Sequence, residues 1–350
     1  MNAPFPLWQR LRETSKPILL YGTGDGADKV CNTCAVFGVK VSGFFASDGY
    51  VRKRLFRGEQ VLSYTQAKER FGDFIILLSF GTSLPYLLEL MENLDANHEF
   101  YAPDLPVVNN SPVFTAEFYE KHNEEFAFAR TLFADHESRT LFDEVLSYKL
   151  SGKIKYLERT ITKEQLWQHL RPQQYKFCAD LGAYDGDTVK EMLEHCPQVE
   201  EIFALEPDEK NFSKLANTVK SISSCNIHPL NVAAWDCEEI ISFTHSGNRS
   251  SRQQPSLETA QGVSLDSVVK DKKLDFIKYD VEGAEQRALL GSKEIISNYA
   301  PDLLVAAYHR SDDLFVLPRL LHELNPRYKL YLYRQKCLPA WDLNIVAKAE

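Results

Sequence analysis

The chain has 350 residues, of which 44% are hydrophobic and 25% charged, a composition typical of folded globular proteins and not of disordered or fibrous ones. At about 150 residues per domain, this length predicts two domains. Forty basic and 49 acidic residues give a formal charge of −9. Nucleic acids and anionic lipids call for a basic face, so neither is an expected partner. No apolar run approaches the roughly 20 residues of a spanning helix. Scattered cysteines and the lack of a signal-peptide pattern predict a cytoplasmic protein.

Two of the seven cysteines, Cys31 and Cys34, form a lone CxxC with apolar neighbours at helical spacing. A metal or redox site of this type usually has a second cysteine pair or a histidine cluster in the sequence, and this motif has neither. We therefore expect both thiols to be small buried residues of a helix.

The first hundred residues alternate apolar strands with glycine turns and helices. Strands are predicted at 17–21, 41–46 and 74–79, and helices at 28–37 and from Gly81 to about residue 94. Continuous apolar strands of this type indicate a parallel sheet that is covered on both faces. The turn-rich stretch 109–112 closes the region, which predicts a first domain over residues 1–113.

The turn after the first strand contains Gly22, Gly24 and Ala27, and Asp48 follows the second strand. This spacing outlines a dinucleotide-binding fingerprint, with Gly22, Gly24 and Asp48 as candidate nucleotide contacts. The stretch also loosely resembles the small Rossmann-like N-terminal domain of bacterial sugar-nucleotide acyltransferases, which implies binding of a nucleotide sugar. Two alternatives stay open: a structural module without a ligand, and a nicotinamide-dependent oxidoreductase that uses this turn.

Residues 114–172 carry apolar side chains three and four positions apart, such as Phe126, Ala129 and Phe133, which predicts a helical connector. Short apolar strands return from residue 173 to 350. They are expected at 177–181, 201–205, 274–279, 303–308, 328–333 and 343–347. The predicted fold class is therefore α/β, with two doubly wound Rossmann-like domains joined by the connector.

The strongest motif lies at the end of strand 177–181 and runs Asp180-Leu-Gly182-Ala183-Tyr184-Asp185-Gly186-Asp187-Thr188. Glycines let the backbone approach a ligand, and the N-terminus of the following helix offers unpaired N–H groups. Three acidic residues would repel a pyrophosphate, and a Lys-Ser/Thr pair is missing. The acidity instead suits the amino group and the sulfonium of S-adenosylmethionine.

Two further strand ends extend this motif into a predicted nucleoside site. Glu206, with Pro207 after it, ends the next strand, and a carboxylate can accept hydrogen bonds from both hydroxyls of a ribose. Asn231, Ala233, Ala234 and Trp235 follow a third strand and offer small side chains and an aromatic ring beside an adenine. The carboxyl edge of a parallel sheet would bring these residues together.

The fourth strand leads into Lys278-Tyr-Asp280-Val-Glu282-Gly-Ala-Glu285. With the upstream glycine motif, this segment resembles the FkbM family of S-adenosylmethionine-dependent methyltransferases, from about residue 173 to the end. The resemblance implies a class I methyltransferase fold, with Asp280 and Glu282 facing the transferred methyl group. It also implies cofactor contacts from Asp180, Gly182, Ala183, Tyr184, Gly186, Thr188, Glu206, Pro207, Asn231, Ala233, Ala234 and Asp280. The acidic residue that family members commonly carry shortly before the histidine of the next strand is absent before His309.

Methyl transfer is an in-line displacement, so alignment provides most of the catalysis. An alcohol acceptor must also lose its proton. His309 is a candidate general base that Asp280 or Glu282 would orient, and the same three side chains could instead hold a divalent metal. A structural histidine is the third alternative. Lys278 is expected to be solvated or to face a helix, and the polar stretch 249–252, with Arg249 and Arg252, to be an exposed loop.

These motifs predict an S-adenosylmethionine-dependent methyltransferase that acts on a hydroxyl of a sugar or small natural product. The expected partner is a small-molecule or glycan acceptor, not a nucleic acid or a membrane, and a homo-oligomer is compatible with the sequence. The alternative is an inactive scaffold that captures a nucleotide sugar through its N-terminal domain.

Overall fold

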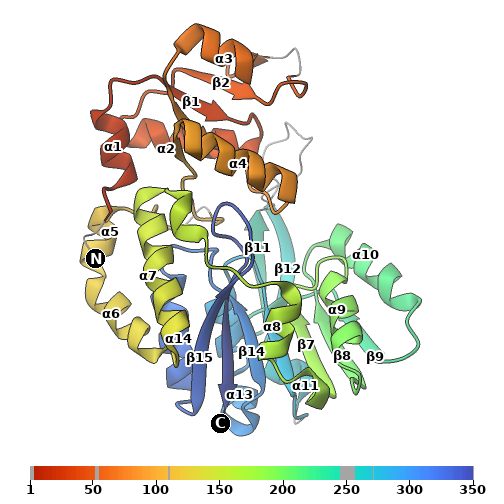
Figure 1. The fold of residues 1–350 in the computed structure, drawn as a ribbon. Coiled ribbons are helices and arrows are strands. Elements are labelled where there is room, and N and C mark those ends of the chain that lie inside the picture. Colours follow the sequence, from red (N-terminus) through yellow and green to blue (C-terminus); the bar gives the residue numbers. More distant parts are fainter. Residues whose placement is uncertain (1–3, 52–54, 109–110, 245–256, 271, 350) are drawn as a thin grey trace.

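The computed structural model describes residues 4–51, 55–108, 111–244, 257–270 and 272–349. Figure 1 shows the N-terminal sheet above the C-terminal sheet, with α5, α6 and α7 along one side of the molecule. Among the described residues, no helix is long and apolar enough to cross a membrane.

The N-terminal sheet has the Rossmann strand order. Five strands run parallel in the order β4-β2-β1-β5-β6, and the short β3 pairs antiparallel with β4 at the edge. Their bounds are β1 Ile18–Tyr21, β2 Gly43–Ala46, β3 Leu55–Phe56, β4 Glu59–Ser63, β5 Ile75–Leu78 and β6 Glu99–Tyr101. Sequence inspection found β1, β2 and β5 but not the short β3, β4 and β6. The helices are α1 Leu7–Glu13, α2 Asp25–Val36, α3 Tyr64–Phe71 and α4 Pro85–Asn97.

Alternating side chains of β1 enter two apolar clusters. Leu19 and Tyr21 belong to one cluster, and Ile18 and Leu20 to the other, so the sheet is covered on both faces as predicted. Cys31 and Cys34 are free buried thiols of α2 in the second cluster, which agrees with the expected packing role.

The stretch between the two sheets is helical, as expected. It contains α5 Ala116–Lys121, α6 Asn123–Leu132, α7 His136–Ser151, a 3-10 turn at Ile154–Leu157, and α8 Lys163–His169. Phe126, Phe142 and Val145 pack in the core of the C-terminal sheet, whereas Tyr148 packs in an N-terminal cluster and donates a hydrogen bond to the Ala102 carbonyl. Helix α7 therefore joins both cores. The domain boundaries at 113 and 172 stay a prediction.

The C-terminal sheet has seven strands in the order β9-β8-β7-β13-β14-β16-β15, and β16 runs opposite to the other six. The strands are β7 Phe177–Leu181, β8 Glu201–Leu205, β9 Asn226–Leu230, β13 Phe276–Tyr279, β14 Asp302–Ala306, β15 Tyr328–Arg334 and β16 Leu343–Ala349. The helices are α9 Asp187–His195, α10 Glu209–Lys220, α11 Leu265–Val269, α12 Glu285–Leu290, α13 Lys293–Tyr299 and α14 Asp313–Leu324, and a second 3-10 turn at Pro172–Gln174 precedes β7. The predicted α/β class with two doubly wound domains is confirmed.

A small third sheet was not predicted. It consists of β10 Ala233–Ala234, β11 Glu239–Thr244 and β12 Leu257–Val263, in the order β10-β12-β11. The stretch 249–252 lies outside the described residues, so its expected role as an exposed loop stays a prediction.

Candidate active site

Four predicted residues meet at the carboxyl edge of the C-terminal sheet. Asp180 lies near the end of β7, while Glu206, Asp280 and His309 follow β8, β13 and β14. Strand β7 lies between β8 and β13, where the strand order reverses. In open α/β sheets this switch point is where ligands bind, because the loops diverge there.

The glycine turn after β7 packs directly on the backbone after β13. Gly182 has a φ of +88°, and a Cβ there would lie 1.9 Å from the Asp280 carbonyl oxygen, so no other residue fits. Gly186, also at φ +88°, precedes the first turn of α9. Tyr184 adopts a φ of +47° and is half exposed, whereas Ala183 is buried. Left-handed backbone at a non-glycine residue is strained and is typical of functional sites.

Of the two environments expected for Lys278, solvent or a helix, the structure shows the helix, because its side chain reaches Thr188 of α9. Lys278 pairs in register with Asp180, and its Nζ lies 3.7 Å from Asp180 Oδ1 and 3.6 Å from Asp280 Oδ2. The same Nζ donates a hydrogen bond to Thr188 Oγ1. The Lys278 ammonium thus lies beside two predicted cofactor carboxylates and Thr188. These contacts depend on the register between β7 and β13, so they could not be predicted from the sequence.

The two aspartates differ in charge state. Asp180 is fully buried and neither of its oxygens has a hydrogen-bond partner among the described residues. Burial raises the pKa of Asp180 to about 7, despite Lys278. Burial also acts to raise the pKa of Asp280, but Lys278 and His309 outweigh it and lower that pKa. Asp280 therefore supplies a fixed negative charge, and Asp180 is poised to ionise beside a cationic ligand.

Glu206 is buried at the end of β8, where backbone groups orient it. Its two carboxylate oxygens accept hydrogen bonds from Tyr184 N and Asp208 N, each at 2.9 Å. Burial raises the pKa of Glu206 to about 7. Each oxygen keeps a second lone pair, so the carboxylate can still accept from the two hydroxyls of a ribose.

The residues expected beside an adenine have structural contacts of their own. Asn231 Nδ2 donates to the carbonyls of Glu206 and Pro207, which fixes the loop after β8. Ala233 and Ala234 are buried in β10. The Trp235 indole N–H donates to Glu239, and Arg287 lies over its ring. Any adenine contact of these residues stays a prediction.

His309 lies in a group of carboxylates. Its Nδ1 is 2.9 Å from Glu285 Oε1, an ion contact that is not aligned as a hydrogen bond, and its Nε2 is 3.5 Å from Asp280 Oδ1 and 3.7 Å from Glu282 Oε2. Burial acts to lower the pKa of His309, but these three carboxylates outweigh it and raise the pKa to about 10. Without a ligand, His309 is therefore an imidazolium at neutral pH.

Glu282 and Glu285 have opposite environments. The Glu282 side chain is 73% exposed on a backbone at φ +53°, so it is accessible to a substrate. Glu285 is buried, and its Oε1 accepts hydrogen bonds from Val281 N and Gly283 N. Sequence inspection placed Glu285 in the motif but gave it no role, because its contact with His309 spans two strand ends.

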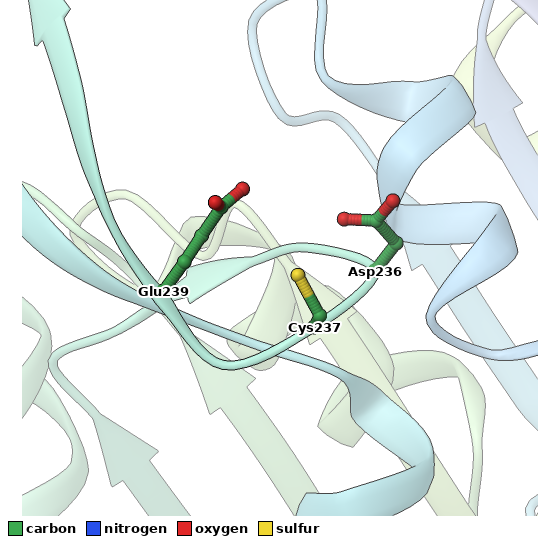
Figure 2. A group of neighbouring side chains, drawn as sticks. All are labelled: Asp236, Cys237 and Glu239. Atoms are coloured by element: carbon green, nitrogen blue, oxygen red, sulfur yellow. The ribbon is translucent and has the colours of Figure 1, made fainter.

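The donor set of a possible metal differs from the predicted one. Candidate ligand atoms of Asp280, Glu285 and His309 lie within 4.8 Å of one another, and this group does not include Glu282. A second such group, Asp236, Cys237 and Glu239, lies around the start of β11 (Figure 2). Two of its members already have partners: Arg287 donates to Asp236, and the Trp235 indole donates to Glu239.

The N-terminal glycine turn is largely occupied by packing. Gly22 has a φ of +115° and faces Ser79 and Phe80, while a Cβ at Gly26 would lie 2.2 Å from the Ser79 carbonyl oxygen. Gly24 has open space around it and precedes α2. The Asp48 carboxylate accepts from Thr65 N and Oγ1 at the start of α3, which lowers its pKa. Nucleotide binding by Gly22, Gly24 and Asp48 stays a prediction.

Comparison with known proteins finds a family similarity in the C-terminal part of the chain. Residues 180–330 match the family model described as a methyltransferase FkbM domain. The structure of a methyltransferase FkbM from Methylobacillus flagellatus KT is similar with a TM-score of 0.74 at 20% identity, over 99% of this chain and 95% of that one. An rRNA methylase from Streptococcus thermophilus has a TM-score of 0.38 at 11% identity, over 55% of this chain and 98% of that one. No curated protein matches.

Proposed function

We propose that this chain transfers the methyl group of S-adenosylmethionine to a hydroxyl of a sugar or small natural product, since residues 180–330 match the model of a methyltransferase FkbM domain. The observation that carries the proposal is the acidic edge formed by Asp180, Glu206 and Asp280 beside the tightly packed turn at Gly182. A cofactor with a sulfonium and an amino group neutralises such an edge, whereas a pyrophosphate does not.

Glu206 would bind the ribose hydroxyls, and the backbone of Gly182 to Gly186 would lie against the methionine part. Asp180 and Asp280 flank Lys278 at the strand ends beside this turn. Binding of a cation there favours the ionised form of Asp180, whose pKa of about 7 lies close to neutral pH. Cofactor binding is therefore expected to release few protons above pH 8 and more near pH 6.

His309 would accept the proton of the acceptor hydroxyl through Nε2, with Glu285 at Nδ1 orienting the ring. A base must first be deprotonated, and the pKa of about 10 keeps His309 protonated in the empty site. The sulfonium would compensate the same carboxylates that raise this pKa. We therefore expect cofactor binding to lower the pKa of His309 and to prepare it as a base.

A divalent metal is a second candidate for activating the hydroxyl. The buried Glu285 Oε2 and both ring nitrogens of His309 have no hydrogen-bond partner among the described residues, so this donor set fits an ion. Asp280, Glu285 and His309 would hold it, and it would lower the pKa of a bound hydroxyl. Loss of methyl transfer after chelation, with recovery on adding Mn²⁺ or Mg²⁺, favours the metal over the base.

Calorimetry with S-adenosylhomocysteine tests the cofactor assignment. We expect binding by the wild-type chain, at least tenfold weaker binding by Glu206→Ala, and wild-type binding by Glu209→Ala, an exposed carboxylate of α10. Thermal melting confirms that both variants are folded. Absence of binding by the wild-type chain, or equal binding by both variants, would falsify the proposal.

The acceptor is then sought with methyl-labelled S-adenosylmethionine and a panel of methyl glycosides, nucleotide sugars and catechols. Transfer of label to a hydroxyl supports the methyltransferase assignment. Stabilisation by nucleotide sugars without any cofactor binding would instead support the scaffold alternative.

A further inference from the structure

The carboxyl edges of the two parallel sheets meet in the same region between the domains. On the N-terminal side, α2 follows β1 and Gly81 follows β5; on the C-terminal side, Gly283 follows β13 and His309 follows β14. Ligands of open α/β sheets bind at this edge of each sheet. Where two such edges face each other, the cofactor can bind at one edge and the methyl acceptor at the other.

One set of contacts fixes the N-terminal edge to the His309 loop. Val107 N donates to the His309 carbonyl at 2.9 Å, and Lys29 Nζ of α2 donates to the Val107 carbonyl at 3.1 Å. Val108 packs so closely on Gly283 that a Cβ added to Gly283 would lie 2.6 Å from Val108 Cγ1. Ser111 Oγ accepts from Ser311 N. These contacts hold the two edges at a set distance.

The loop between β15 and β16 provides a second connection. Thr82 and Leu338 exchange both backbone hydrogen bonds, at 2.7 and 3.0 Å, so a segment of the C-terminal domain pairs with the N-terminal edge. Arg334, fully buried, donates to the carbonyls of Gln335 and Cys337 and fixes the base of this loop.

Trp341 ends this loop, and its ring lies on Gly81. A Cβ at Gly81 would lie 2.0 Å from Trp341 Cζ3, so the indole occupies the space that a side chain would take. Trp341 is partly exposed, and no hydrogen-bond partner for its indole N–H is found in the described part of the chain. The ring is thus held in place while part of its surface and its donor remain accessible.

The same loop leads Trp341 to the predicted methyl-transfer centre. Ala306 pairs with Asn344, and Ala307 N donates to the Leu343 carbonyl, so Asp342 and Trp341 directly precede the strand that pairs with β14. The charge of Asp342 also acts on Tyr308. The Tyr308 hydroxyl donates to Asp280 Oδ1. The Asp342 carboxyl is within electrostatic reach of Asp280 and Lys278. Trp341 therefore joins the N-terminal edge, which its ring contacts at Gly81, to Asp342, the next residue, whose carboxyl is within electrostatic reach of Asp280.

We propose that Trp341 is the specificity-determining contact for the methyl acceptor, and that this acceptor is a hydroxylated ring compound bound between the two carboxyl edges. A flat indole recognises a ring by stacking on its face and by donating its N–H to a hydroxyl. The proposal rests on the proposed function, since it assigns the acceptor side of the same site.

Fluorine NMR of the full chain labelled with 5-fluorotryptophan tests this proposal. The chain has four tryptophans, and Trp341→Phe assigns the Trp341 resonance. The probes are methyl glucoside, a nucleotide sugar and catechol at millimolar concentration, added with and without S-adenosylhomocysteine. These three separate a sugar ring, a nucleotide and an aromatic diol as the source of the stacked ring.

We expect at least one probe to shift the Trp341 resonance and to leave those of Trp8 and Trp167 in place. The probe that shifts it should also accept the methyl group, with a KM raised about tenfold in Trp341→Leu and less in Trp341→Phe. Gly81→Ala should displace the ring and raise KM similarly, whereas Ser83→Ala, an exposed position of the same segment, should not.

The proposal is overturned if no probe moves the Trp341 resonance, or if a methylated probe has an unchanged KM in Trp341→Leu. Failure of the proposed function gives a different result, because S-adenosylhomocysteine then does not bind. The titrations without cofactor still decide the role of Trp341 in that case.

Discussion

Gly182→Ala is the most direct perturbation of the cofactor edge. Ordinary van der Waals contact begins at 3.4 Å, whereas the new Cβ would lie 1.9 Å from the Asp280 carbonyl oxygen. The segments after β7 and β13 must therefore separate by about 1.5 Å. Asp280 N donates to the Leu181 carbonyl at 2.9 Å across the same junction, and this hydrogen bond is lost when the segments separate.

The magnitude follows from three contributions. An alanine at φ +88° costs about 1 kcal/mol, overpacking against backbone costs about 1–3 kcal/mol, and the lost hydrogen bond costs about 1 kcal/mol. Gly38→Ala is the matched control, because Gly38 has a φ of +69° and no atom within 4 Å of its added Cβ. We expect Gly182→Ala to lower the free energy of unfolding by about 3–5 kcal/mol, against about 1 kcal/mol for the control.

Urea unfolding followed by circular dichroism measures this difference, and calorimetry with S-adenosylhomocysteine measures its effect on the site. Binding should weaken at least tenfold in Gly182→Ala, since the separation moves Asp180 away from Asp280. A difference in unfolding free energy below about 0.5 kcal/mol between the two variants would refute the steric reasoning.

Two further predictions concern buried charges. His309 has a pKa of about 10, so its ionic contacts stabilise the metal-free fold by about 5 kcal/mol below pH 6.5, and this contribution is lost as the pH rises through 10. Glu285→Gln should lower that pKa in a histidine NMR titration and flatten the fall in urea stability between pH 6 and pH 10; an unchanged titration contradicts the assignment. Asp104→Asn should lower the free energy of unfolding by about 3–5 kcal/mol, because it leaves the buried Lys149 ammonium, 2.7 Å from Asp104 Oδ2, without its counter-charge. Glu323→Gln removes the partner of Arg319 at an exposed position and should change the free energy of unfolding by less than about 0.5 kcal/mol. Equal losses in the Asp104 and Glu323 variants would argue against a larger contribution from the buried pair.

Strand positions were predictable where apolar runs are continuous. The strands expected at 177–181 and 201–205 have these bounds in the structure, because residues buried on both faces carry their own signal. The short strands β3, β4 and β6 and the small sheet around Gly262 were missed, since they are short or partly exposed. Their pairing partners define them more than their composition does.

The candidate site also contains residues that were predictable from the sequence and contacts that were not. Gly182 and Gly186 were recognisable because their backbone conformation restricts the residue type, and Asp180, Glu206 and Asp280 because each lies at or near the end of an apolar strand. Lys278 was expected to be solvated or to face a helix, but its contact with Asp180 could not be predicted, since it requires the register between β7 and β13. The contact of Glu285 with His309 likewise joins two strand ends that are distant in the chain.

The sequence by itself determined that this chain has two parallel sheets, a glycine turn with an acidic edge, and the motif around Asp280. These properties are local, because periodicity, positive φ and strand ends act over a few neighbouring residues. Only the tertiary structure decided which carboxylates surround His309 and that Gly81 accommodates Trp341. Charge state and contact across domains depend on distances between segments, and those distances arise only when the chain has folded.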